Sequence, residues 1–326
     1  MSQPGPAEHG TVEHGSGQHG PGEHESAAGG GAGAASGPEY GVEGMIRSYP
    51  VQNALSDYDV VDVDTTRPHP ARMNNYLLGG YDHYEIDRAA AERLIELMPT
   101  TRQAAHELRG FTLRAVRFMA DAGVRQFLDV GSGVPTAPNV HDVAGAIASD
   151  VRVAYVDNDP IVRVHAQSRL AGIAGTVFIP ADAREPSSIL ENAALRELFD
   201  FGQPIGMVLN GLLYYLSDLD APGRIVAALC DALPSGSFVA ATHVTNDLTP
   251  PQELADLAAI GSVMEGSSTP MTVRTEAEFR ALLDGLELVE PGLVQISRWR
   301  PDLAAEAEGE PQGAGVYVWA AVGRKN

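Results

Sequence analysis

The sequence contains very little cysteine and lysine and no long apolar run, and each shortage excludes a class of structure or chemistry. The single cysteine, Cys230, cannot form a disulfide within the chain. The longest apolar stretches, such as "PIGMVLNGLLYYL", are interrupted by Asn or Gly and fall short of the roughly 20 residues that a membrane-spanning helix needs. The first residues also lack the basic and apolar regions of a secretory signal. These features predict a cytoplasmic protein without a membrane segment.

Positive charge is also scarce. Acidic residues outnumber basic ones by 43 to 22, which gives a net charge of −21. A surface this acidic repels phosphate backbones and anionic lipid headgroups, so neither nucleic acid nor a membrane is expected as a partner. The chain has 326 residues, of which 44% are hydrophobic, and this is ample for a substantial core. A small molecule is the preferred class of partner.

The composition divides the chain into three segments. Residues 1–45 contain almost no large apolar side chains, so we expect a disordered tail. Residues 46–123 form a linker and a cap of two amphipathic helices, and residues 124–326 form an α/β domain. The tail carries a five-residue repeat of histidines at His9, His14, His19 and His24. Such a repeat can chelate a transition metal, but a solvated low-complexity tail has the same composition, and we assign no metal site.

Strand-like and helix-like segments alternate in the α/β domain. Apolar runs predict strands at residues 125–130, 151–157, 176–182, 204–211 and 236–244. Helical patterns lie between them, at residues 139–148, 160–171, 187–199 and 221–233. This alternation specifies a parallel sheet with helices on both faces. Two more helices are expected at residues 250–266 and 275–286. The strand-like runs at residues 286–299 and 313–323 predict an antiparallel hairpin on one edge of the sheet.

Polar residues follow each of the first four predicted strands, where ligands bind in an open parallel sheet. Asp129 and the glycine loop Gly131–Gly133 stand at the carboxyl end of the first strand, Asp157 at that of the second, Asp182 at that of the third and Asn210 at that of the fourth. A carboxylate after the second strand can accept both hydroxyls of a ribose, and one after the third can accept from the N6 amine of adenine. Each acid alone is also compatible with a helix cap or a turn. The series at successive strand ends favours a nucleotide site.

The glycine loop is compatible with two kinds of nucleotide. A dinucleotide fingerprint ends in Gly or Ala where this chain has Thr136, and the loop also carries Pro135. Asp129 is unfavourable beside a pyrophosphate but suits the ammonium group of S-adenosylmethionine. The single lysine, Lys325, lies near the C-terminus, so the Tyr-x-x-x-Lys pair of one large class of reductases is absent. S-adenosylmethionine is favoured, with an NAD-dependent oxidoreductase and a non-catalytic S-adenosylmethionine sensor as alternatives.

Several motifs resemble those of the class I S-adenosylmethionine-dependent methyltransferases, namely "FLDVGSGVPT", "VAYVDNDP", "IPADAREP" and "GLLYYLSD". More narrowly, "RPHPARMNNYLLGGYDHYEIDR", "NVHDVA" and "DGLELVEPGLVQISRWRP" resemble an actinobacterial family of S-adenosyl methyltransferases, from about Thr65 to Arg324. The resemblance implies an α/β, Rossmann-like class I methyltransferase fold. Its sheet would be seven-stranded and mostly parallel with an antiparallel last strand, and an N-terminal helical cap would precede it.

The resemblance also implies roles by position in binding S-adenosyl-L-methionine. The amino-acid end would be held by Asp129, Gly131, Ser132 and Gly133, and the ribose by Asp157. The adenine would be held by Asn158, Asp182 and Ala183, and the methionyl side would be lined by Asn210 and Leu212. The segment from Arg72 to Gly80, with Gly79, would fold over the cofactor. Arg72 would meet the cofactor's carboxylate, and Tyr76 would pack against it. Pro135 stands in place of the third glycine of the general class I loop, and this difference affects only the local path of the loop backbone.

The implied reaction is in-line transfer of the sulfonium methyl group to a nucleophilic N, O, S or C atom, in which alignment and exclusion of water supply much of the rate. His243 is the first candidate base, because a neutral imidazole takes a proton near neutral pH. A histidine at a strand end equally suits hydrogen bonding to the backbone. Tyr214 is the second candidate catalytic residue, although aromatic residues at such positions often pack in the core. The expected substrate is a small molecule, and natural-product tailoring follows from the resemblance alone.

Overall fold

The computed structural model describes residues 63–304 and 314–326. The predicted tail at residues 1–45, with its four histidines, and the first part of the segment at residues 46–123 lie outside the described residues. Within the described chain no helix is long and apolar enough to cross a membrane. The same residues contain no group of three or more His, Cys, Asp or Glu side chains placed to hold a metal ion.

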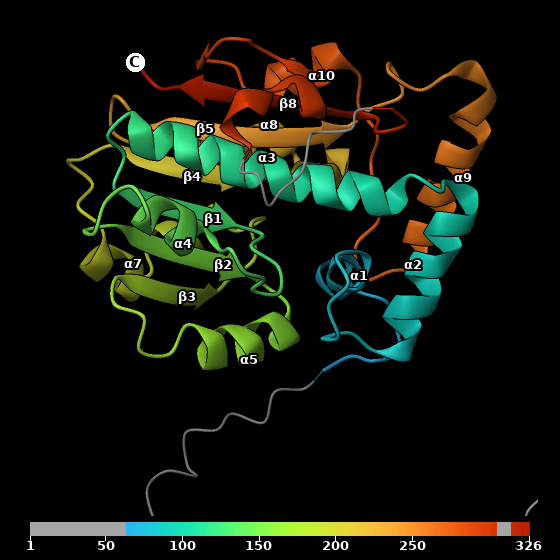
Figure 1. Ribbon diagram of the computed structural model, residues 1–326, viewed down its shortest axis with the longest axis horizontal. Helices are drawn as coiled ribbons and strands as arrows, with labels where there is room; N and C mark the ends of the chain where they lie inside the picture. Colours follow the sequence, from blue (N-terminus) through green and yellow to red (C-terminus); the bar gives the residue numbers. More distant parts are fainter. Residues whose placement is uncertain (1–62, 305–313) are drawn as a thin grey trace, which may run out of the picture. The chain divides into compact units, whose positions relative to one another are not determined.

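A mixed β-sheet forms the centre of the described chain (Figure 1). Five parallel strands stand in the order β3, β2, β1, β4, β5, with the bounds Thr176–Pro180, Arg152–Asp157, Gln126–Val130, Ile205–Leu209 and Phe238–Val244. β8, Val318–Arg324, pairs antiparallel with β5. The strand order reverses between β1 and β4, so the carboxyl ends of these two strands flank the switch point where ligands bind in such sheets.

The outer edge of the sheet consists of two short strands. β6, Glu287–Leu288, and β7, Val294–Gln295, both pair antiparallel with β8. The edge segment advances six residues from Leu288 to Val294 while β8 advances three, from Gly323 to Ala320, so the surplus residues bulge. β6 and β7 together occupy the place of one strand. The sheet therefore has eight strands in the seven positions expected, and β8 is its antiparallel last strand.

Helices cover both faces of the sheet, because neighbouring residues of a strand point to opposite sides. Phe127 belongs to a core shared with α3, α4 and α5, which span Thr101–Asp121, Val140–Gly145 and Pro160–Arg169. Leu128 belongs to the core of the other face, shared with α6, α7, α8 and α10, which span Pro186–Leu190, Ala193–Leu198, Pro222–Asp231 and Glu276–Leu282. These helices fix the strand ends in space.

Two helical predictions need correction. The Pro-rich stretch that begins the family motif forms helix α1, Pro70–Leu77, which the sequence patterns did not predict. Pro70 is the first helical residue, where a missing N–H costs nothing, and His69 is the N-cap. The single helix expected at residues 187–199 is instead two helices, α6 and α7. Asn192 separates them because its side chain caps α7 by accepting from the N–H of Ala194 at 3.0 Å.

A third group of helices lies beyond the carboxyl ends of the parallel strands (Figure 1). It comprises α1, α2 (Glu85–Leu97) and α9 (Leu254–Glu265), whose apolar side chains form a separate small core with the start of α3. The cap therefore includes α9, which follows β5 in the chain and packs against α2. The cap predicted from residues 46–123 is completed by α9, which begins at Leu254, well beyond the end of that segment.

A buried cluster of charged side chains fastens α1 and α2 to the sheet. Asp159, just after β2, accepts at Oδ1 from the N–H of Ile161 at 2.6 Å, which caps α5. Its Oδ2 lies 2.8 Å from Nδ1 of His69 and 3.1 Å from Nε of Arg72. Asp87 of α2 accepts from the backbone N–H of His69 at 2.8 Å. Burial opposes ionisation of Asp159, but the contacts with His69 and Arg72 outweigh it and hold its pKa below the ordinary value.

Replacing Asp159 by Ala should lower the free energy of unfolding by about 3–5 kcal/mol, because it leaves the buried guanidinium of Arg72 without its main partner. Urea unfolding measures this change. The matched control is Asp284→Ala, at an exposed position, which should change the free energy by less than about 0.5 kcal/mol. Equal effects of the two substitutions would contradict the anchoring role of the cluster.

Candidate functional site

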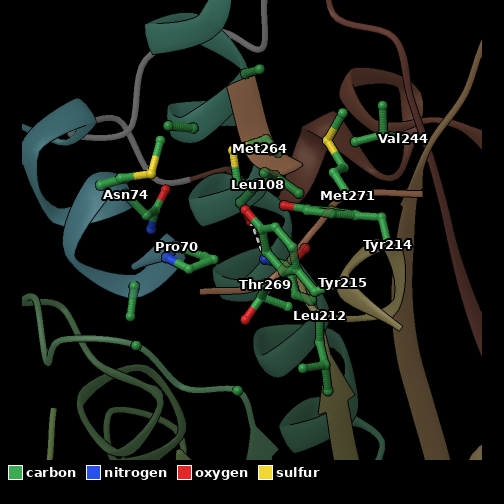
Figure 2. Close-up of a pocket in the computed structure, with 18 of the residues that line it drawn as sticks. Pro70, Asn74, Leu108, Leu212, Tyr214, Tyr215, Val244, Met264, Thr269 and Met271 are labelled. Carbon is green, nitrogen blue, oxygen red and sulfur yellow. Dashed lines mark hydrogen bonds between the residues drawn. The ribbon is translucent and has the colours of Figure 1, made fainter. Parts of the chain in front are cut away.

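A cavity of about 280 Å³ lies at the carboxyl ends of β1 to β4 and extends beneath α1 toward α9 (Figure 2). Most of the predicted site residues line it, namely Asp129, Gly131, Ser132, Gly133, Asp157, Asn158, Asp182, Ala183, Asn210, Leu212 and Tyr214. The structure therefore brings the residues that follow four separate strands to one cavity. Its wall at the strand ends is polar, and its wall of helices is mostly apolar.

The loop after β1 is shaped by two glycines and tied to β2. Gly131 and Gly133 have φ values of +75° and +66°, a conformation that glycine adopts without strain. The N–H groups of Gly131 and Ser132 donate to the carbonyl of Val156, at 2.8 and 3.0 Å, and that of Gly133 donates to Asp157 Oδ2 at 2.8 Å. All three N–H groups thus have acceptors within the protein. A pyrophosphate-binding loop directs such groups at its ligand.

Asp129 differs from the other acids at the strand ends, because none of the described residues donates a hydrogen bond to it. Its carboxyl group borders the cavity and only 8% of the residue is exposed. Burial raises the pKa of Asp129 to about 7, against the opposing charge of Arg109. Arg109 borders the same cavity and donates to the carbonyls of Thr136 and Pro138. A buried carboxyl group without a donor is suited to receive a cationic group of a ligand.

Asp157 and Asp182 are partly satisfied by the protein. Asp157 accepts from two backbone N–H groups, at 2.8 and 2.9 Å, one on each oxygen, and burial raises its pKa. Each oxygen keeps a lone pair that can accept from a ligand hydroxyl. Asp182 accepts from Nδ2 of Asn158 at 2.9 Å and from Nη1 of Arg184 at 3.0 Å. These four side chains form a polar rim along the ends of β2 and β3.

The side chain of Asn210 is fully engaged within the protein. Its Nδ2 donates to the carbonyl of Leu108 and to Oγ1 of Thr112, both at 2.7 Å. Its Oδ1 accepts from Oγ1 of Thr242 at 2.8 Å. Asn210 thus holds α3 against the end of β4. Only its remaining lone pair and its backbone are left for a ligand.

The two candidate catalytic residues have different surroundings. Tyr214 lines the cavity and is hydrogen-bonded to Tyr215, and burial raises its pKa to about 12. His243 is fully buried outside the cavity lining, with Nδ1 2.8 Å from the carbonyl of Val244 and Nε2 3.0 Å from Nη1 of Arg274. Burial lowers the pKa of His243 to about 4, so the ring is neutral. Both ring nitrogens are occupied, which removes His243 as a base and favours its alternative role in hydrogen bonding at the strand end.

The segment from Arg72 to Gly80 does lie over the cavity, but Arg72 and Tyr76 point away from it. The guanidinium of Arg72 is buried in the charged cluster around Asp159. The ring of Tyr76 stacks with Arg102, whose guanidinium carbon is 4.7 Å from the ring centroid. Neither side chain lines the cavity. The roles expected for them at the cofactor are therefore withdrawn.

The glycines of this segment end α1 instead of contacting the cavity. Gly79 has a φ of +81°, and a Cβ on Gly80 would overlap the side chain of Asn75. The α1 side chains that do line the cavity include Met73 and Asn74. A helix turns about 100° per residue, so neighbours of Arg72 face the cavity while Arg72 itself does not.

The sequence patterns do not identify the wall opposite the strand ends. It consists mainly of apolar residues on helices and on the chain near β8, including Leu94, Met98, Leu257, Ile260, Met264, Met271 and Tyr317. Amphipathic spacing marks the helical ones as inward-facing, which is equally the signature of a filled core. The sequence patterns also do not predict that His69 and Arg109 line the cavity. Only their position, one before α1 and one on α3 beside Asp129, brings them to the cavity.

Comparison with known proteins identifies one matching family and structures with a similar fold. The S-adenosyl methyltransferase family model matches residues 57–326. The fold is similar to that of a DUF574 family protein from Streptomyces avermitilis, at 36% identity and a TM-score of 0.75, over 81% of this chain and 100% of that one. It is also similar to a candidate methyltransferase from Thermobifida fusca, at 37% identity and a TM-score of 0.73, over 81% of this chain and 97% of that one. No curated protein matches.

The pH dependence of stability should reveal the buried carboxyl group of Asp129. Its pKa is about 7 in the folded protein against an ordinary value of 3.8, so between these values the folded state holds the extra proton. Its contribution to stability is therefore greatest below the unfolded pKa and is lost as the pH rises through 7. The free energy of unfolding, relative to the Asp129→Asn variant, should fall by up to about 1.4 kcal/mol per pH unit. Urea unfolding across this pH range measures the free energy of unfolding of both proteins. Parallel pH profiles for the wild type and the variant would contradict the raised pKa of Asp129.

Proposed function

Because the chain belongs to the S-adenosyl methyltransferase family and is an S-adenosylmethionine-dependent methyltransferase, we propose that it methylates a small molecule inside the cavity beneath α1. The cofactor lies along the carboxyl ends of β1 to β4, and the acceptor lies against the helices. The net charge of −21 supports a small molecule over a nucleic acid. The family resemblance further supports a role in tailoring a natural product.

The observation that carries the proposal is the buried carboxyl group of Asp129, to which none of the described residues donates a hydrogen bond. S-adenosylmethionine bears an ammonium group at its amino-acid end, and this cation can donate a charge-assisted hydrogen bond to the buried carboxyl group of Asp129. Arg109 borders the cavity close enough for its charge to act on Asp129. We assign Arg109 to the carboxylate of the cofactor, in place of Arg72. Its guanidinium carries five N–H donors and donates to the carbonyls of Thr136 and Pro138 at the edge of the cavity.

The remaining strand ends fit the rest of the cofactor. Asp157 retains a lone pair on each oxygen, and we assign these to the two ribose hydroxyls. Asn158, Asp182 and Ala183 line the next part of the cavity and are assigned to the adenine. Asp182 keeps a fixed orientation because Arg184 and Asn158 both donate to it, so it presents a defined acceptor toward an exocyclic amine.

The glycine loop supports this cofactor over a dinucleotide. A pyrophosphate is held by backbone N–H groups at the start of a helix. In this loop the N–H groups of Gly131, Ser132 and Gly133 already donate to acceptors on β2 and to Asp157. An anion placed here would also lie beside Asp129. The loop therefore offers a close backbone approach without offering donors for phosphate, which suits the uncharged and cationic parts of S-adenosylmethionine.

When bound, the cofactor supplies an electrophilic methyl group on its sulfonium sulfur, which a nucleophile displaces in line. The chain contributes alignment and exclusion of water. Leu212 and Tyr214 line the cavity just after β4 and are assigned to the methionyl side. With a pKa of about 12, Tyr214 stays protonated at neutral pH, so it orients an acceptor by hydrogen bonding and does not act as a base.

The Asp129→Asn variant tests the cofactor site. It should weaken S-adenosylmethionine binding about 10- to 100-fold near pH 8, because a hydrogen bond to a charged group is worth about 1.5–3 kcal/mol. Isothermal titration calorimetry measures the dissociation constants. The matched control is Asp284→Asn, which makes the same chemical change at an exposed position and should leave binding unchanged.

The pH gives an independent readout of the same contact. Wild-type affinity should fall as the pH drops below about 7, where Asp129 takes up a proton, and the variant should lack this dependence. Equal affinity in wild type and variant would contradict the assignment of Asp129. Tight binding of NAD without binding of S-adenosylmethionine would contradict the choice of cofactor.

A further inference from the structure

The cavity continues past the strand ends into a chamber with an apolar lining. We define the acceptor chamber as the part lined by Leu94, Met98, Leu257, Ile260, Met264 and Met271. These residues come from α2, α9 and the segment after α9, and all of them belong to the small core of the cap or pack against it. Figure 2 shows Met264, Met271 and Leu108 around the same cavity as Tyr214 and Tyr215.

No charged side chain of the described residues lines the acceptor chamber. Apart from tyrosines, the ionisable residues that line the whole cavity are His69, Arg109, Asp129, Asp157, Asp182 and Arg184. The three acids lie at the carboxyl ends of β1, β2 and β3, and Arg184 pairs with one of them at 3.0 Å. His69 lies against Asp159 after β2, and Arg109 against carbonyls of the loop after β1. Every charge is therefore held at the strand ends, where the cofactor lies.

This separation of charge restricts what can enter the chamber. A charged group moved from water into an apolar site without a partner loses several kcal/mol of solvation free energy. Among the described residues the chamber has no charged partner to offer, so it disfavours an ionised carboxylate, phosphate or amine. The cofactor, by contrast, meets a carboxyl group at its cationic end. The two parts of the cavity thus select opposite kinds of molecule.

On the wall opposite the strand ends the hydroxyl of Tyr317 donates to Oε2 of Glu253 at 2.6 Å, and other polar groups near the chamber lie on the side toward the cofactor. Tyr214 and Tyr215 stand there with Asn74 and Thr269 (Figure 2). Burial keeps both tyrosines protonated, with the pKa of Tyr214 at about 12 and that of Tyr215 raised well above its ordinary value. They offer hydrogen bonds without charge. A hydroxyl group of a ligand finds partners here, whereas its body meets only apolar surface.

We propose that the methyl acceptor is an uncharged, largely apolar molecule that fills the acceptor chamber and directs one hydroxyl group toward Tyr214 and Tyr215. The proposal rests on the proposed function, because it assigns the other end of the same cavity to the cofactor. Four methionines, Met73, Met98, Met264 and Met271, line the cavity on this side. Their unbranched, flexible side chains adapt to an irregular apolar shape, which suits a bulky ring system.

A pair of probes that differ in charge tests the proposal. The full chain, saturated with S-adenosylhomocysteine, is titrated with 2-naphthol and with 2-naphthoate at neutral pH, where the first is uncharged and the second is an anion of similar size. The naphthol should bind at least about tenfold more tightly, because the chamber gives the carboxylate no partner. Calorimetry or quenching of probe fluorescence measures both dissociation constants.

Two variants locate the probe. Met264→Gln keeps the length of the side chain but adds an amide, and Ile260→Trp fills the chamber; each should weaken naphthol binding about tenfold while S-adenosylhomocysteine still binds. The control is Leu219→Gln, at a position that is 98% exposed, which should change neither affinity.

The outcomes separate the two proposals. Failure of the wild-type chain to bind S-adenosylhomocysteine would overturn the proposed function itself. Normal binding of S-adenosylhomocysteine, together with naphthoate binding as tight as that of naphthol, would overturn the inference alone. The inference would also fail if folded variants at both Met264 and Ile260 bound naphthol as tightly as the wild type does.

Discussion

The ion cluster around Asp159 is the interaction on which the rest of the site depends. One carboxylate caps α5 through the N–H of Ile161 and meets His69 and Arg72 from the start of α1. The end of β2 and the roof of the cavity are thereby joined by a single buried charge. Removing the acidic or the basic side chains of the cluster leaves the opposite charges buried in the protein interior without a partner. The cavity lies between the strand ends and α1, and the cluster ties α1 to the end of β2.

Four aspartates at the ends of β1, β2 and β3 share one chemical group but perform different tasks, because their surroundings differ. Asp159 is satisfied by charged side chains, Asp157 by backbone N–H groups, and Asp182 by Asn158 and Arg184. Asp129 alone lacks a donor among the described residues, and burial brings its pKa to about 7. A carboxylate with a structural role is hydrogen-bonded within the protein, whereas a carboxylate that binds a ligand accepts its hydrogen bond from the ligand. This contrast points to the cationic end of the cofactor.

The strands and the acids that follow them could be predicted from the sequence, because buried parallel strands are continuous apolar runs and ligands bind at their carboxyl ends. Side-chain direction could not. His243 ends a predicted strand as expected, yet it faces Arg274 and not the cavity. Arg72 lies on the segment that covers the cavity but points into the ion cluster. The acceptor chamber could not be predicted from the sequence either, because Met98 and Met264 lie far apart in the chain. Their amphipathic spacing is the same as that of residues in a filled core.

The division of the cavity into a charge-bearing half and an apolar half is the central claim, and a crystal structure of the complex with S-adenosylmethionine tests it most directly. We expect the ammonium group within hydrogen-bonding distance of Asp129, the ribose hydroxyls on Asp157, and the methyl group directed past Leu212 and Tyr214 into the acceptor chamber. A complex in which Asp129 contacts no part of the cofactor, or in which the cofactor's charged end occupies the chamber between Met98 and Met264, would contradict the account.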